Sequence, residues 1–297
     1  MKDRFVLATI LAHPDDETFG VGGTLIRYAA EGVRVHSLCL TRGEKGWNGD
    51  PAHPLVAPEA LAERRAGELA EAGRRMGLAS TTCLTYPDGD LAGVADGLIV
   101  PDIVRWIRRI RPDVVITWGP DGGYGHPDHI AAGERTLRAL EAAGSDRSDR
   151  APGQPHRVRR CYRFVASADF VDGITAINPH FAEYMQTLAV KPQRWTRDRL
   201  GAAIDTSGVV EQKIEAMVAH ETQEPDYREW IGARERIPWL FAEEVYTREF
   251  PDPGGPPLRP ISSRRCAPRP PRGGPDRRAR RRGRASGRPS RRAARRS

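Results

Sequence analysis

The chain has 297 residues, and its 47 lysines and arginines outnumber its 39 aspartates and glutamates, for a formal net charge of +8. No apolar run approaches the roughly 18 residues of a membrane span. The first apolar run lacks the small residues of a signal-peptide cleavage site. Four cysteines without a CxxC pair exclude a zinc ribbon or a thioredoxin-like site, so we expect a cytoplasmic protein with reduced thiols.

The positive charge is concentrated at the C-terminus. Residues 251–297 hold sixteen arginines against two aspartates, a balance of +14, which leaves −6 for residues 1–250. The composition of 251–297 cannot bury a core, so we predict a single domain over 1–250 and an Arg/Pro-rich disordered tail. The tail either binds nucleic acid through its phosphates or has no role. A further hypothesis is a misread terminus, because a GC-rich message read out of frame has this bias.

Apolar runs and amphipathic patterns alternate along the chain. In order, they predict strand 5–11, helix 17–31, strand 33–40, helix 58–76, strand 81–86, helix 97–110, strand 114–118, helix 130–143, strand 161–167 and helix 209–220. The alternation predicts an α/β fold with a Rossmann-like, doubly wound, mostly parallel sheet and helices on both faces. In the strand order 3-2-1-4, the first and fourth strands meet at the topological switch point, where ligands bind.

Three glycines, Gly20, Gly22 and Gly23, lie near the start of the first predicted helix. Their spacing does not match the G-x-G-x-x-G fingerprint of a dinucleotide site, and acidic side chains stand where a pyrophosphate would bind. We therefore expect these glycines to allow close packing of the helix on the sheet.

Two polar segments rich in histidine and carboxylates follow the first and fourth strands. Residues 12–17 read AHPDDE and residues 123–129 read GYGHPDH. An imidazole and three carboxylates are costly to crowd into one hexapeptide unless a cation or bound water shares their charge. Because both segments end at the same edge of the predicted sheet, we expect them to form one site for a catalytic divalent metal.

Catalytic zinc takes three protein ligands and leaves a fourth position for water. The sequence predicts His13, Asp16 and His129 as the ligands, with Fe(II) as the alternative metal. Asp15, beside a ligand, is placed to act as the general base. His126 would stabilise the oxyanion or protonate the leaving amine, and Tyr124 would polarise the carbonyl from the other side.

A purely structural interpretation competes with this assignment. Asp15 or Asp16 can serve as the N-cap of the following helix, and His13 can close the loop. If only one of the two polar segments were present, the structural interpretation and the metal-site interpretation would be equally well supported. Two such clusters after two predicted neighbouring strands favour the metal site. Glu17 then belongs to the first helical turn, with a role in orienting a ligand left open.

The two segments also resemble the LmbE/PIG-L-like family of zinc-dependent N-deacetylases. Weaker similarity covers 41–44, 65–69, 86–89 and 213–223. The resemblance implies zinc on the three predicted ligands, the same base, and removal of an acetyl group from an N-acetylglucosaminyl-type glycoconjugate. It also implies a sugar-binding arginine at Arg65, with Asp88 or Glu44 accepting hydroxyl hydrogen bonds.

Several alternatives stay open. Arg65 could equally be a solvated arginine on an Arg/Glu-rich helix face. His220, at a helix end, either approaches the site or is a structural histidine beside the helix dipole. The substrate could be a thiol conjugate of the mycothiol or bacillithiol type. The chain could also be a non-catalytic module that binds a sugar or nucleotide. Nothing in the sequence predicts an oligomeric state.

Overall fold

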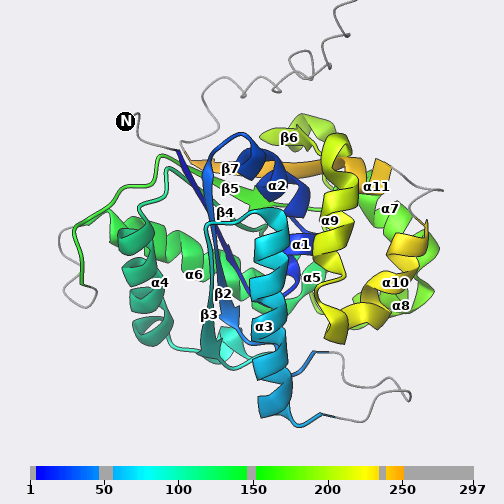
Figure 1. The fold of residues 1–297 in the computed structure, drawn as a ribbon, viewed down its shortest axis with the longest axis horizontal. Coiled ribbons are helices and arrows are strands. Elements are labelled where there is room, and N and C mark those ends of the chain that lie inside the picture. The colour runs from blue at the N-terminus through cyan, green and yellow to red at the C-terminus, as the bar shows by residue number, and fades with distance from the viewer. Residues whose placement is uncertain (1–4, 47–55, 146–151, 234–238, 251–297) are drawn as a thin grey trace, which may run out of the picture. The chain divides into compact units, whose positions relative to one another are not determined.

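The computed structural model describes residues 5–46, 56–145, 152–233 and 239–250. They form a seven-stranded sheet with helices on both faces (Figure 1). The predicted fold class is confirmed, and the sheet is mixed rather than wholly parallel. The strands are β1 Val6–Leu11, β2 Arg34–Thr41, β3 Ser80–Tyr86, β4 Val114–Trp118, β5 Arg160–Phe164, β6 Ala202–Asp205 and β7 Glu243–Phe250.

The helices flank the sheet in two layers. In chain order they are α1 Asp16–Phe19, α2 Gly22–Ala30, α3 Pro58–Met76, α4 Asp96–Ile110, α5 Gly122–Gly125, α6 Pro127–Ala143, α7 Ala168–Ile177, α8 Pro179–Thr187, α9 Val210–Met217, α10 Glu224–Ala233 and α11 Trp239–Ala242. Short 3₁₀ turns are η1 Leu91–Gly93, η2 Arg197–Arg199, η3 Ser207–Val209 and η4 Glu221–Gln223. Helices α4 and α6 pack together, and α9 packs against α2 and α3 (Figure 1).

The strand order is β3-β2-β1-β4-β5-β7-β6. Strands β1 to β5 run parallel, so the predicted order 3-2-1-4 is confirmed. β7 joins β5 in antiparallel pairing, and β6 joins β7 in the same way. β1 is central and all six of its residues are buried, as its apolar composition predicts. The carboxyl ends of β1 and β4 therefore open side by side at the switch point.

Some predicted boundaries are wrong. The single helix expected over 17–31 is two helices, α1 and α2, separated at Gly20 and Val21. The close packing expected of the glycines is present at Gly23, where an added Cβ would lie 2.6 Å from Thr206. The helix expected over 209–220 ends at Met217, and the strand expected over 161–167 ends at Phe164, where Val165 turns to bond β7.

Two predictions concern the chain as a whole. The disordered tail predicted over 251–297 lies outside the described residues, so its composition alone supports it. Within the ranges that the structure describes, no helix is both long enough and apolar enough to cross a membrane.

Candidate active site

The two polar segments meet at the carboxyl ends of β1 and β4. Because β1 and β4 are parallel neighbours, with Leu7 opposite Val114, their following loops emerge at the same edge. The first loop leads directly into α1, and the second forms α5 and the start of α6. Residues more than a hundred positions apart therefore share one crevice, as the sequence predicts.

The three predicted ligands lie together and are buried. His13 Nδ1 is 3.2 Å from His129 Nε2, which is 3.1 Å from Asp16 Oδ1. The other Asp16 oxygen, Oδ2, is 3.9 Å from His13 Nδ1. Histidine nitrogens and carboxylate oxygens are the ligands that catalytic zinc takes. Two histidine nitrogens and a carboxylate gathered in one buried place are therefore a donor set whose chemistry fits zinc.

Surrounding groups fix the orientation of two of these side chains. Asp16 Oδ2 accepts hydrogen bonds from the amides of Ala12 and His13 and from Trp118 Nε1. The Trp118 ring also stacks on His129 at a centroid distance of 3.9 Å. His129 Nδ1 donates to the carbonyl of Gly122, which leaves Nε2 to face Asp16.

The charges of the site favour a bound cation. Burial alone would raise the pKa of Asp16, but the neighbouring His129 and His13 hold it well below its usual range. Burial would lower the pKa of His13, but hydrogen bonds with Asp128 and Asp88 raise it to about 10. Those bonds engage Nε2, so its other nitrogen faces His129. A cation at the three ligands would replace the proton on that nitrogen.

A second set of donors shares His13. The ligand atoms of His13, Asp88 and Asp128 all lie within 4.8 Å of one another, as do those of His13, His126 and His129. Asp128 accepts backbone hydrogen bonds from Gly89 and Leu91, so its carboxylate is already held by the chain. These bonds suit Asp128 to orienting His13. The sequence pattern alone predicts no role for Asp128, although this residue stands inside the GYGHPDH segment.

Asp15 occupies the N-cap position of α1, yet its carboxylate makes no capping hydrogen bond. Its Oδ2 instead accepts a hydrogen bond from Arg65 Nη2 at 2.9 Å. Burial raises the pKa of Asp15 to about 7, against the opposing effect of the Arg65 guanidinium. A carboxylate with this pKa is suited to taking a proton near neutral pH. The capping interpretation of Asp15 is therefore wrong.

Arg65 is only 3% exposed, so the alternative of a solvated helix face is wrong. Its Nη1 donates to the carbonyl of Gly43, and its Nη2 donates to the carbonyl of Pro14 as well as to Asp15. The guanidinium thus joins α3 to the loops after β1 and β2.

The other two predicted substrate residues link neighbouring loops. Asp88 has one oxygen 3.1 Å from His13 Nε2, and the other accepts a hydrogen bond from the Lys45 amide. Glu44, which is half-buried, accepts a hydrogen bond from the amide of Asp88. Asp88 therefore faces the ligand His13, and Glu44 is the more exposed of the two.

His126 and Tyr124 line the second loop. His126 caps α6 by accepting the amide of Asp128 at Nδ1, and its ring lies 4.9 Å from His13 and 4.7 Å from His129. Burial, with the neighbouring histidines, lowers the pKa of His126 to about 3, so it is neutral at pH 7. The Tyr124 ring lies 5.1 Å from His129, edge to face. Gly125 permits this loop, with φ of 103° and the carbonyl of Val190 where a Cβ would be.

Two segments of weaker similarity meet behind the site. Thr222 donates to Glu68 from both its amide and its hydroxyl, at 2.9 and 2.7 Å. His220 is fully buried, and its Nε2 lies 2.7 Å from Glu17 Oε1. Glu17 Oε2 in turn accepts the amide of Asp15. The sequence predicts a helix-end position for His220, near the site or in a structural role, and nothing in its local sequence indicates the partner 203 positions away.

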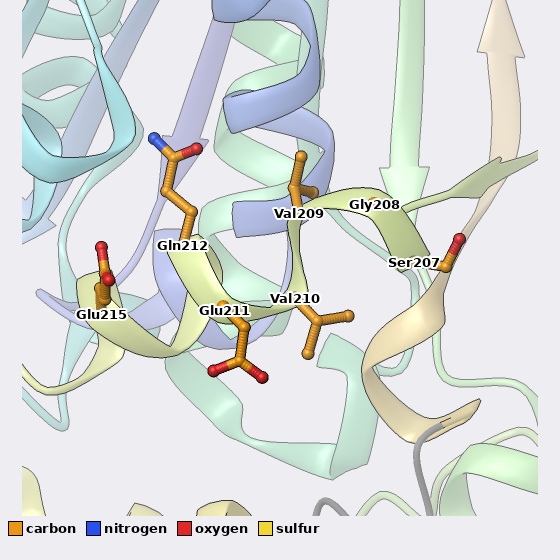
Figure 2. Close-up of a pocket in the computed structure, with 7 residues that line it drawn as sticks. All are labelled: Ser207, Gly208, Val209, Val210, Glu211, Gln212 and Glu215. Atoms are coloured by element: carbon orange, nitrogen blue, oxygen red, sulfur yellow. The ribbon is translucent and has the colours of Figure 1, made fainter. Parts of the chain in front are cut away.

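A separate hollow of about 500 Å³ lies along residues 207–215. Figure 2 shows Glu211 and Gln212 pointing away from each other, and Gln212 donates to the carbonyl of Arg75. The polar groups of this hollow do not converge on a common point, so it lacks the arrangement of a ligand site.

Solved structures share this fold. A conserved protein from Thermus thermophilus is 26% identical, with a TM-score of 0.58 over 83% of this chain and 94% of the other. N,N'-diacetylchitobiose deacetylase from Pyrococcus horikoshii (20% identity, TM-score 0.55, 83% and 84%) and the hydratase GalB from Pseudomonas putida (18%, 0.57, 83% and 97%) match in fold alone. The fold and the crevice define the class, a Rossmann-like α/β enzyme with a histidine–carboxylate centre.

The sequence comparisons identify the family. The PIG-L family model, described as GlcNAc-PI de-N-acetylase, matches residues 8–140. Curated relatives named 1D-myo-inositol 2-acetamido-2-deoxy-alpha-D-glucopyranoside deacetylase include those of Rhodococcus jostii (36% identical, covering 83% of this chain and 91% of the relative) and Kineococcus radiotolerans (34%, 71% and 67%). The chain belongs to the PIG-L (LmbE-like) family of deacetylases and is an amide hydrolase by class, which confirms the predicted resemblance.

Proposed function

We propose that the chain is a zinc-dependent hydrolase that removes an acetyl group from an N-acetylglucosaminyl-inositol type of glycoconjugate. The observation that carries the proposal is the buried triangle of His13, Asp16 and His129, with Asp15 beside it. The names of the curated relatives support the substrate class.

Zinc in such a site supplies a Lewis acid and lowers the pKa of its water to about 7. The residues of the chain provide the proton transfers. Asp15 accepts a proton from the attacking water, because its carboxylate is next to a ligand and its pKa is raised to about 7. Arg65 holds that carboxylate in place by donating a 2.9 Å hydrogen bond to it.

His126 and Tyr124 act on the other side of the scissile amide. His126 is neutral at pH 7 and its Nδ1 accepts the amide of Asp128, so its Nε2–H can donate a hydrogen bond to the developing oxyanion. The leaving amine would take the proton that Asp15 accepted from the water. The Tyr124 hydroxyl polarises the acetyl carbonyl. Both residues come from the loop after β4, so the group that acts on the water and the groups that act on the carbonyl belong to different loops.

The substrate residues divide by exposure. Glu44 is half-buried, and we propose that it accepts hydrogen bonds from sugar hydroxyls. Arg65 and Asp88 are buried and bonded to protein groups. Their effect on the substrate would be exerted through Asp15 and His13, which they contact.

A product screen tests the function. Purified zinc-loaded protein is assayed for free amine released from N-acetylglucosaminyl-inositol, simple N-acetylglucosamine derivatives, and thiol conjugates. Release from the first substrate supports the proposal, whereas release from thiol conjugates alone would assign the rival amidase function. Asp15→Asn should lower kcat by about 10²–10⁴-fold with zinc still bound. Binding of the sugar without turnover, unaffected by chelation, would identify a non-catalytic module.

Measuring the metal content of the purified protein tests which metal it binds. The protein purified aerobically and anaerobically is analysed for zinc and iron, and turnover is compared after reloading with each. His129→Ala should lower the metal content, and an unchanged stoichiometry would refute the role of His129 as a ligand. Higher anaerobic turnover with Fe(II) than with zinc would make iron the native metal.

A further inference from the structure

Asp15 has an unusual backbone conformation. Its φ of 112° and ψ of −31° lie outside the small left-handed region open to non-glycine residues. Among the described residues, the other non-glycine with positive φ is Arg111, which has the ordinary left-handed geometry of a helix end. A conformation such as that of Asp15 costs about 1–3 kcal/mol and persists only when surrounding contacts hold it.

Two side chains hold Asp15: one bonds its backbone amide and the other bonds its carboxylate. The Asp15 amide donates to Glu17 Oε2 at 3.0 Å, and its carboxylate accepts from Arg65 at 2.9 Å. An N-cap aspartate ordinarily bonds the first amides of its own helix. Here Glu17 takes the amide of Asp15, and the Asp15 carboxylate is left for the crevice.

His220 holds Glu17 in turn. Glu17 is 1% exposed and His220 is fully buried, and their 2.7 Å contact excludes solvent. Burial would lower the pKa of His220, but Glu17 raises it above its ordinary value, which favours an ion pair. One Glu17 oxygen is thereby fixed on His220, so the other must face the Asp15 amide.

The position of His220 is itself fixed by α3. Thr222, two residues on, bonds Glu68, and Glu68 stands one turn beyond Arg65 on that helix. The segment 220–222 is therefore joined by hydrogen bonds to the helix that carries Arg65. Through His220, the Glu17 contact to Asp15 is linked to the same helix as the Arg65 contact.

We propose that Glu17 and His220 are positioning residues that hold Asp15 at positive φ, so that its carboxylate faces the attacking water. The proposal rests on the proposed function, in which Asp15 is the base. Without the pair, Asp15 relaxes toward an N-cap conformation and its carboxylate turns to the amides of α1. The loss then falls on kcat, because neither side chain contacts the substrate or supplies a ligand atom.

Kinetics of His220 variants test the proposal. His220→Leu should lower kcat by about 10–100-fold, the usual effect of removing an outer partner of a site, with KM and zinc content nearly unchanged. His220→Gln, which can still donate to Glu17, should recover most of that loss. His156→Leu removes a histidine that bonds the Pro112 carbonyl away from the site and serves as the control.

A double-mutant cycle separates positioning from a general loss of structure. If His220 acts through Asp15, His220→Leu should add almost no loss of kcat in an Asp15→Asn background. Losses that multiply, or a His220→Leu variant with full kcat, would overturn the proposal.

A crystal structure of Glu17→Ala gives a readout that needs no activity. The Asp15 φ should move to a negative value, and a φ that stays near 112° would overturn the proposal. If the wild-type protein releases no amine from any substrate, the proposed function fails, while this crystal structure still decides whether Glu17 holds Asp15.

Discussion

The indole of Trp118 touches two of the three proposed ligands, so replacing it should weaken metal binding without removing a ligand. Its Nε1 donates to Asp16 Oδ2 at 3.1 Å, and its ring stacks on His129. Trp118→Phe deletes the donor and keeps an aromatic ring in the stack. A hydrogen bond to a charged group contributes about 1.5–3 kcal/mol. At 1.4 kcal/mol per tenfold, about 10–100-fold weaker zinc affinity is expected.

The assay is a titration of metal-free protein with zinc against a chromophoric chelator. Trp106→Phe is a matched control, because Trp106 is equally buried and its Nε1 donates to Thr82, away from the site. Both variants lose one indole hydrogen bond and should lose similar stability. Equal zinc affinity in the two would refute the inference that Trp118 orients Asp16.

Three further predictions concern stability. Asp15→Gly should be more stable than Asp15→Ala by about 1–3 kcal/mol in chemical denaturation. Both variants lose the carboxylate, but only glycine accepts a φ of 112° without strain. Equal stability of the two variants would show that residue 15 is not strained. Glu244→Leu should lower the free energy of unfolding by about 3–5 kcal/mol in chemical denaturation, since it leaves the Lys213 ammonium buried without its 2.7 Å partner. Lys213→Met should lower it less, because the Glu244 carboxylate keeps its hydrogen bonds from the amides of Gly23 and Thr24 at the start of α2. A larger loss for Lys213→Met than for Glu244→Leu would contradict this. Chelation should lower the Tm, since zinc at 100 times its Kd adds about 2.7 kcal/mol, and an unchanged Tm would count against a bound metal.

The first five strands could be predicted because each is a short segment rich in apolar, aromatic or β-branched residues between polar turns. Apolar runs such as 5–11 leave no other way to bury their side chains, and the right-handed crossover rule restricts their order. β6 and β7 were not predicted. β7 carries consecutive charged residues at both ends, Glu243–Glu244 and Arg248–Glu249, so it has no apolar run, and it pairs antiparallel with β5, which a pattern of parallel β-α-β units does not predict.

The site shows the same division. The sequence by itself determined which residues gather at the switch point, because polar segments that follow neighbouring parallel strands must share one edge. The sequence could not show whether Arg65 is solvated or buried, or whether His220 has a partner in the site. Periodicity predicts which face of a helix a residue lies on, but not which residues from other elements pack against that face. Only the tertiary structure brought Glu17 and His220 together across 203 positions and placed Arg65 against Asp15. The reason is physical: burial and charge pairing are properties of the packed chain, and these contacts turn the Asp15 carboxylate toward Arg65 instead of the amides of α1.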